Sequence, residues 1–266
     1  MLDFVSKLSY DVNDLRELMR LLCGEGGCPW DREQTHDSIR RNMLEEAYEA
    51  VEAIDSKNTE HLIEELGDVL MQVVFHADIA ERANEFSLDD IADATCKKLI
   101  SRHPHVFGDV KVDTGDDYLA FWDEMKRKEK HHETTSEIMN SVASSLPALW
   151  RAEKIQKKAA KVGFDWPDHS GATDALRAEL VELDEAIQAN SGIEEELGDL
   201  IFSAVNVARF FDIDPENALN NASTKFIERF TRMEAMATQQ GNNLENMSLA
   251  EMEELYQAVK AQNNTG

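Results

Sequence analysis

The stretches EELGDVLMQVVFHADIA, residues 64–80, and EEELGDLIFSAVNVARF, residues 194–210, decide the fold. Each contains a Glu-x-x-Asp pair, and the residues after the pair are apolar almost all round a helix, as in buried helices. Acids on the first turn of a buried helix cost free energy unless a cation or hydrogen bonds compensate them. The stretches therefore predict two buried helices that begin with compensated acids, and a solvated surface face fits them poorly.

A second acid pair precedes each stretch. Glu46-x-x-Glu49 lies in LEEAYEAVEAI, residues 44–54, and Glu182-x-x-Glu185 lies in ELVELDEAI, residues 179–187. Residues three apart share one helix face, so each copy offers two helices with two carboxylates apiece. Such oxygen ligands suit Mg²⁺, or Mn²⁺ in its place, better than zinc or copper. The predicted metal ligands are Glu46, Glu49, Glu65 and Asp68 in the first copy and Glu182, Glu185, Glu196 and Asp199 in the second.

The duplication extends beyond the acids and predicts two domains. Aligning Trp30 with Trp166 maps the first Glu-x-x-Glu pair onto the second without a gap. The spacing to the next acid pair is then shorter in the second copy, as a trimmed loop would allow. With the polar stretch HHETTSEIMNS as the best linker, we predict an N-terminal domain over residues 1–130, a linker over 131–141 and a C-terminal domain over 142–266.

Helical spacing of apolar residues predicts an all-α fold. Leu44, Ala47, Val51 and Ile54 repeat at helical intervals, and β-branched alternation typical of strands is absent. All five prolines fall beside the matching tryptophans, in loops or at helix starts.

Composition limits the partners and the compartment. The formal charge of −26 repels nucleic acid and anionic lipid, whereas a nucleotide stays possible because Mg²⁺ can bridge carboxylates and phosphates. There is no signal-peptide pattern and no apolar run of about 18 residues. The three cysteines lack zinc-site spacing and are expected to be reduced thiols. We expect a cytoplasmic protein that binds neither nucleic acid nor membranes.

Scarce basic residues recur after the acids. A Lys-x-x-x-Arg pair follows the acids in each copy, and an aromatic residue four before a lysine comes after it in both. Residues four apart share a helix face, and basic pairs of this kind suit phosphate contacts. The aromatic residues suit either base stacking or a core. The candidate substrate-binding residues are Lys98, Arg102, Trp122, Lys126, Lys225, Arg229, Tyr256 and Lys260.

A di-iron site is a weaker alternative. Bundle di-iron proteins use Glu-x-x-His on two helices, and here Glu33-x-x-His36 and Glu129-x-x-His132 match only in loop or linker sequence. His76 lies on a buried helix without a counterpart in the second copy, which favours a core histidine over a ligand.

The acid blocks together with GCPWDREQT (27–35), RHPHVFGD (102–109) and SLPALWRAEKIQKKAAKVGFDW (145–166) resemble the MazG family of all-α nucleoside triphosphate pyrophosphohydrolases. The resemblance covers nearly the whole chain in the tandem two-domain form. It implies Mg²⁺-dependent cleavage of (d)NTP to NMP and pyrophosphate, for nucleotide-pool housekeeping. It also implies a homodimer in which helix pairs from two subunits form four-helix bundles.

The family's leading glutamate matches Glu45, but Val181 stands at that position in the second copy, and Glu179 is expected one position off the required face. The resemblance favours the second copy for most of the cleavage. Two other functions stay open: a non-catalytic nucleotide sensor or partner-binding scaffold, and a base-specific enzyme like the all-α dUTPases. A carboxylate that metal does not fully occupy would take the proton of the attacking water. The predicted catalytic residues are Glu45, Glu49, Glu182 and Glu185.

Overall fold

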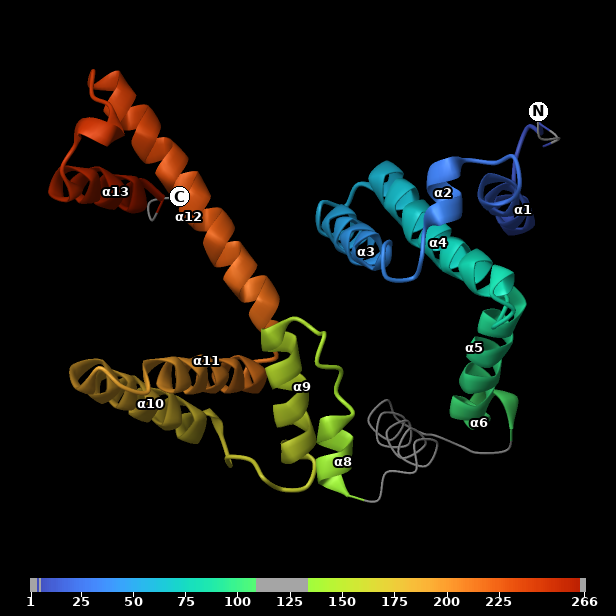
Figure 1. Cartoon of the computed structure of the whole chain (residues 1–266). Helices are drawn as coiled ribbons and strands as arrows, with labels where there is room; N and C mark the ends of the chain where they lie inside the picture. Colours follow the sequence, from blue (N-terminus) through green and yellow to red (C-terminus); the bar gives the residue numbers. More distant parts are fainter. Residues whose placement is uncertain (1–3, 5, 109–133, 264–266) are drawn as a thin grey trace. The chain divides into compact units, whose positions relative to one another are not determined.

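The computed structural model describes residues 4, 6–108 and 134–263, and these form two compact units, each treated separately here. Figure 1 follows the chain from the first unit, residues 1–125, to the second, residues 126–266. The division falls between residues 109 and 133, outside the described residues, so the domain limits of 1–130 and 142–266 stay a prediction.

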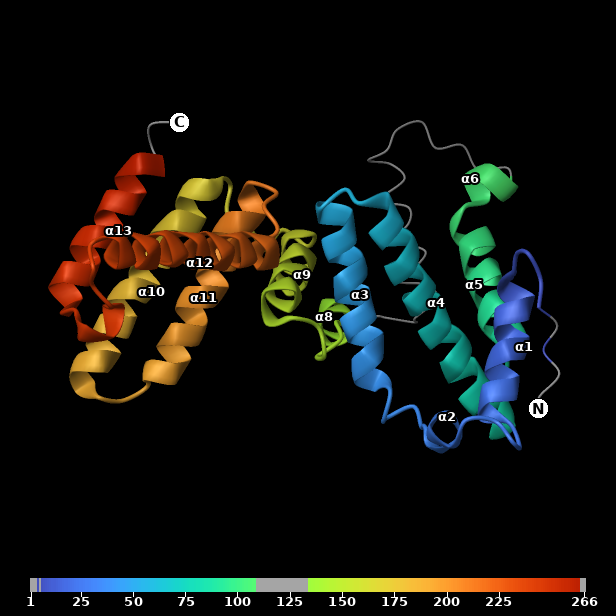
Figure 2. The ribbon, with the colours of Figure 1, turned by 90° about the horizontal axis from the view of Figure 1, so that it is seen from above.

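The first unit is built on an antiparallel helical hairpin. Helices α3 (Arg40–Asp55) and α4 (Thr59–Arg82) lie side by side, as Figure 2 shows, and α1 (Val12–Cys23) packs against α4. The short α2 (Pro29–Glu33), α5 (Leu88–Arg102) and α6 (Pro104–Phe107) complete the unit. A core lies at the α1–α4 contact and consists of Met19, Cys23, Ile39, Val74 and Phe75.

Local sequence explains where these helices begin. The Asp11 side chain accepts hydrogen bonds from the backbone at the start of α1, and Asn58 does the same for α4. At α5 the Ser87 and Asp90 side chains cap each other's backbone N–H groups reciprocally. Only residues 56–58 connect α3 to α4, and this short connection sets how the acids of the two helices face each other.

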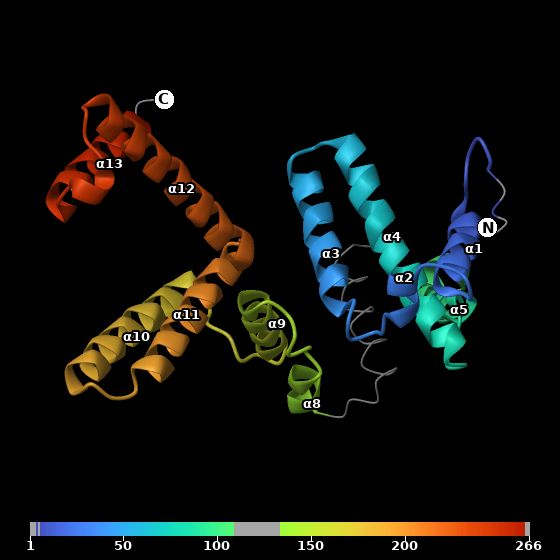
Figure 3. The same ribbon diagram turned by 45° about the horizontal axis from the view of Figure 1, so that its top comes forward.

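The second unit repeats the hairpin. Figure 3 shows α10 (His169–Ala189) and α11 (Ile193–Phe210) side by side, and α9 (Ala148–Ala160) packs on α11. The long α12 (Pro215–Gln239) leads through the 3₁₀ turn η1 (Leu244–Asn246) to α13 (Leu249–Asn263), which packs back on α12. Helix α8 (Thr135–Asn140) lies inside the predicted linker 131–141 and contacts α9.

The all-α prediction is confirmed, because the described residues contain helices and connecting turns but no strand. The helical assignment of both acid stretches is also confirmed, since residues 64–80 lie in α4 and residues 194–210 in α11. No helix among the described residues is long and apolar enough to cross a membrane.

One part of the burial prediction is wrong for the single chain. Helix α11 is not covered on all sides: only Val205 is buried, while Leu197, Ile201 and Phe202 are each more than 40% exposed. The physical reason is that the helices packing on the α10–α11 hairpin leave one of its sides open. Helix α4 is better covered, yet Ile63, Leu66 and Leu70 are exposed there too.

Candidate functional site

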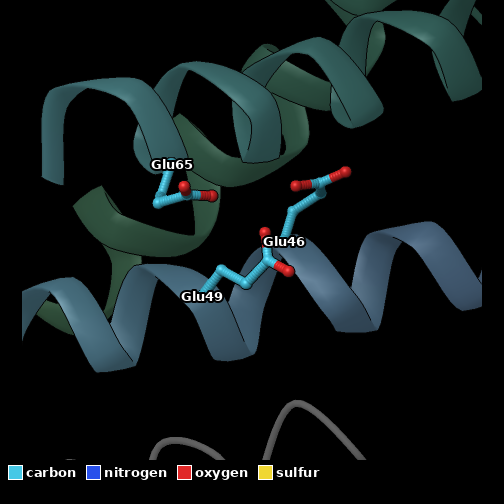
Figure 4. A group of neighbouring side chains, drawn as sticks. All are labelled: Glu46, Glu49 and Glu65. Atoms are coloured by element: carbon cyan, nitrogen blue, oxygen red, sulfur yellow. The ribbon is translucent and has the colours of Figure 1, made fainter. Parts of the chain in front are cut away.

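Three carboxylates meet between α3 and α4. One oxygen from each of Glu46, Glu49 and Glu65 lies within 4.8 Å of the others, and Figure 4 shows the three side chains converging from the two helices. Glu65 is only 6% exposed, and its Oε2 atom is buried without a hydrogen-bond partner among the described residues. A buried anionic oxygen without a partner is costly, so this group fits a cation.

Burial and mutual repulsion both raise pKa values in the first group. Burial raises the pKa of the Glu46 carboxyl above its ordinary value, and the charges of Asp68, Glu49 and Glu65 raise it further. Burial and the neighbouring Glu49 likewise raise the pKa of Glu65. All four predicted acids of the first copy therefore interact, although Asp68 lies outside the closest group of three.

The second unit gathers a corresponding but not identical group. Oxygens of Glu179, Glu196 and Asp199 lie within 4.8 Å of one another. Burial and the charges of Glu182 and Asp199 raise the pKa of both Glu179 and Glu196. Four acids therefore interact here as well, with Glu182 next to the closest three. These side chains are more exposed than Glu65, since Glu196 and Glu179 are half-buried and Asp199 is exposed.

That Glu179 does not take the leading role of Glu45 stays a prediction, but the residue does have a place among the acids. The structure brings Glu179 into the acid group, whereas Glu185 is exposed and belongs to neither group among the described residues. The physical reason is how far α10 is shifted along α11. In this position Glu179 and Glu182 face Asp199 and Glu196. The first unit has the same arrangement, in which Glu46 and Glu49 face Asp68 and Glu65.

In space, Glu46 thus corresponds to Glu179, whereas the gap-free alignment on the tryptophans pairs Glu46 with Glu182. A signal was present in the sequence, because Glu179-x-x-Glu182 is itself a Glu-x-x-Glu pair. In the corrected alignment Ala178, rather than Val181, corresponds to Glu45. Glu45 is exposed, and its Oε1 accepts a hydrogen bond from Arg41 Nε at 2.8 Å.

The basic candidates lie on helices next in the chain to each hairpin. Lys98 and Arg102 are on α5, where Lys98 is exposed. Lys225 and Arg229 share α12, and the buried Arg229 Nε has no hydrogen-bond partner among the described residues. Within the described part of the chain no ion pair joins Lys98, Lys225 or Arg229 to the acid groups. Trp122 and Lys126 lie outside the described residues.

Tyr256 and Lys260 share helix α13. The Tyr256 ring centroid is 6.0 Å from that of Phe226 on α12, and both side chains are half-buried or exposed. This contact favours a packing role for the half-buried Tyr256 ring. Lys260 is one turn further along the same helix and is half-buried.

His76 does not join the acids. Its Nδ1 atom is 2.8 Å from His36 Nδ1, the two rings stack, and burial followed by the charge of His36 lowers the pKa of His76. His76 therefore has a packing partner inside the first unit, as expected for a core histidine.

Both acid groups offer only oxygen atoms, which is the donor set of hard cations. Together with the orphaned Glu65 oxygen, this chemistry fits a divalent metal in the first unit. The candidate site consists of the two acid groups, one on each of the duplicated hairpins.

Comparison with known proteins gives consistent results. The family model for the MazG nucleotide pyrophosphohydrolase domain matches residues 34–107 and 168–233, which include both acid groups. The chain is 43% identical over 252 residues to a nucleoside triphosphate pyrophosphohydrolase/pyrophosphatase MazG of Thermotoga maritima, covering 95% of this chain and 96% of that protein.

Two further relatives are similarly close. A nucleoside triphosphate pyrophosphohydrolase of Escherichia coli K12 is 40% identical over 249 residues, covering 92% of this chain and 95% of that protein. The uncharacterised protein YabN of Bacillus subtilis is 44% identical over 257 residues, and the matched part is 52% of its length. Each of the three relatives matches nearly all of this chain, so the similarity covers both hairpins.

Proposed function

Because the chain belongs to the MazG nucleotide pyrophosphohydrolase family, we propose that it hydrolyses nucleoside triphosphates to nucleoside monophosphates and pyrophosphate with Mg²⁺. The observation that carries the proposal is the pair of convergent carboxylate groups, one in each matched domain. Mn²⁺ is expected to substitute, because its ligand preferences are similar. A housekeeping role on the nucleotide pool would place the protein in the cytoplasm.

The residues divide into two tasks. Glu46, Glu49, Glu65 and Asp68 would hold metal in the first unit, and Glu179, Glu182, Glu196 and Asp199 in the second. When bound, Mg²⁺ supplies positive charge that offsets the triphosphate and the developing charge on the leaving pyrophosphate. The basic residues of α5 and α12 would contact phosphate oxygens.

A carboxylate also has to accept the proton of the attacking water. Glu49 and Glu182 are the candidates, because they face Glu65 and Glu196 from the opposite helix of each hairpin. Burial and then the charges of Glu49 and Glu182 raise the pKa of the neighbouring Glu65 and Glu196, respectively. Glu45, already paired with Arg41, is a weaker candidate, and Glu185 is not one.

We propose a homodimer on the evidence of the open hairpin faces. Leu197, Ile201 and Phe202 form an exposed apolar row on α11, and Gly198 lies within it. A Cβ atom at Gly198 would meet nothing within 4 Å, so packing inside the chain does not explain a helix-interior glycine that costs about 1 kcal/mol. Gly67 in α4 has the same surroundings. Close approach of a helix from a second subunit would account for both.

Product analysis tests the activity. Purified chain would be incubated with Mg²⁺ and each (d)NTP in turn, and nucleotide products separated by ion-exchange chromatography. We expect NMP and pyrophosphate, and a Glu65→Gln/Glu196→Gln double variant as the inactive control. Orthophosphate plus NDP would contradict the proposal. Tight nucleotide binding without turnover would instead support a sensor, and turnover of dUTP alone would support a base-specific enzyme.

A further inference from the structure

Beside the first acid group lies a histidine that is neither a proposed metal ligand nor a candidate proton acceptor. His61 Nε2 is 3.0 Å from Glu65 Oε1, one helical turn earlier on α4. The backbone N–H of His61 donates to the Asn58 side chain that caps this helix, at 3.2 Å. Because the cap holds the first turn of α4, the imidazole approaches Glu65 from a fixed point on the same face.

The contact leaves the two oxygens of Glu65 in different states. Oε1 is next to the imidazole, whereas Oε2 is buried and has no partner among the described residues. One carboxylate oxygen of Glu65 also belongs to the group with Glu46 and Glu49, which meet it from α3 in Figure 4. His61 itself is not a member of that group. The imidazole therefore contacts the carboxylate of Glu65 without being one of the three grouped side chains.

The second unit lacks this arrangement and provides an internal reference. The residue four before Glu196 is Gly192, which has no side chain to donate. Glu196 is also more exposed than Glu65, so water can solvate its carboxylate. A positioning contact is thus present only where the carboxylate is buried and cannot rely on solvent.

We infer that His61 is a positioning residue for the metal site of the first unit: its Nε2–H holds Glu65 Oε1, so that Oε2 is presented to the divalent cation. This inference rests on the proposed function, because it requires Glu65 to be a metal ligand. Partners behind a ligand fix its rotamer, and their loss typically costs about 10- to 100-fold in metal affinity.

Metal titration of the full chain tests the inference. Glu179→Gln/Glu196→Gln would remove competing sites in the second unit, and calorimetry would measure Mn²⁺ affinity in this background. We expect His61→Ala to weaken binding by about 10-fold or more. His61→Gln should retain most of the affinity, because its side-chain amide can donate to the same oxygen. Thermal unfolding without metal would establish that each variant is folded.

The controls distinguish the positioning role of His61 from the existence of the metal site in the first unit. Glu65→Gln in the same background should abolish the remaining site. If Glu65→Gln weakens Mn²⁺ binding but His61→Ala does not, the positioning role is overturned while the metal site stands. If His61→Gln binds as weakly as His61→Ala, donation to Glu65 is not the cause and the inference is again overturned. Unchanged affinity in Glu65→Gln would overturn the metal site of the first unit together with the role of His61.

Discussion

The two hairpins hold corresponding acids at different depths. In the first unit Glu65 is buried and next to His61, while in the second Glu196 is half-buried and Asp199 is exposed. The packing around each hairpin differs as well, since α1 shares a core with α4, whereas an apolar row on α11 is exposed to solvent. The comparison teaches that a duplicated carboxylate group can be kept while its local stabilisation changes completely.

The largest expected effect is the loss of activity when a candidate proton acceptor, Glu182 or Glu49, is substituted. We expect Glu182→Gln to lower kcat for pyrophosphate release by about 100-fold or more, because a metal ligand and candidate proton acceptor is lost. Glu185→Gln is the matched control and should keep most activity, since Glu185 lies outside the acid group. Glu49→Gln should cost less than Glu182→Gln if the second unit carries most cleavage.

Pyrophosphate release by the three variants under saturating Mg²⁺ would measure these effects. Equal losses in Glu182→Gln and Glu185→Gln would contradict the spatial correspondence of Glu49 with Glu182. A loss confined to Glu49→Gln would assign the cleavage to the first unit.

A second prediction concerns an ion pair that only the second unit has. Arg209 on α11 binds Asp165 in the segment before α10, with Nη1 to Oδ2 at 2.9 Å, and the two side chains are 10% and 25% exposed. Asp165→Asn should lower the free energy of unfolding by about 1–3 kcal/mol. Asp174→Asn, in the exposed pair with Arg177, should change it by less than about 1 kcal/mol. Urea unfolding followed by circular dichroism would compare them.

The pH dependence of this difference has a definite sign. The hydrogen bond from Arg209 lowers the pKa of Asp165, so its stabilising contribution is present above the unfolded pKa of about 3.9. The contribution is lost as the pH falls through the lower, folded value. The gap between wild type and Asp165→Asn should therefore be constant above about pH 5 and narrow in strong acid. A gap that widens in acid would rule out this explanation.

Metal removal should reveal the repulsion within both acid groups. The pKa values of Glu46, Glu65, Glu179 and Glu196 are raised, so their stabilising contribution is full below about pH 4.3 and lost as the pH rises through the folded values. Saturating Mg²⁺ should thus raise Tm at pH 7.5 by on the order of 5 °C, and by less at pH 5.

The same scans sharpen the comparison of the units. In EDTA at pH 7.5, Glu65→Gln should raise Tm more than Glu196→Gln, because Glu65 is the more buried carboxylate. Differential scanning fluorimetry at the two pH values would measure both effects. An equal Mg²⁺ shift at pH 5 and pH 7.5 would be incompatible with proton competition.

The smallest predicted effect is at the helix glycines. Gly198→Ala should stabilise α11 itself by about 0.5–1 kcal/mol, because alanine is the better helix former and its Cβ meets open space in the chain. If a second subunit packs there, the same change should weaken dimerisation in analytical ultracentrifugation. Gly67→Ala offers the parallel test in α4. An unchanged dimer in both variants would show that the glycines do not line the interface.

The sequence was sufficient to predict the helical fold and the acid group of the first unit. Helical spacing correctly predicted α4 and α11, and Glu46, Glu49 and Glu65 meet as their spacing implied. In α10, however, two overlapping Glu-x-x-Glu pairs satisfy the same rule. The level of one helix against its partner decides between them, and that level depends on the length of the connection rather than on any local pattern.

Burial was harder to predict than helicity. An apolar run reports that a helix avoids water, but not which chain covers it, and for Leu197, Ile201 and Phe202 the single chain does not. Residue pairs far apart in sequence were also beyond reach: Arg209 with Asp165, and His36 with His76, are joined only where a connecting segment packs against a helix.

The starting points of the two acid helices have an electrostatic consequence. Glu196 lies within the first turn of α11, which begins at Ile193, whereas Glu65 lies in the second turn of α4, which begins at Thr59. The second unit therefore holds its acids closer to the positive end of a helix macrodipole, which favours a nearby anion by about 0.3–1 kcal/mol. Aligned backbone amides in α11 can therefore stabilise a carboxylate electrostatically, where in α4 an imidazole contacts it. This stabilisation belongs to the backbone, so no side-chain substitution removes it, and a longer α10–α11 connection would move it.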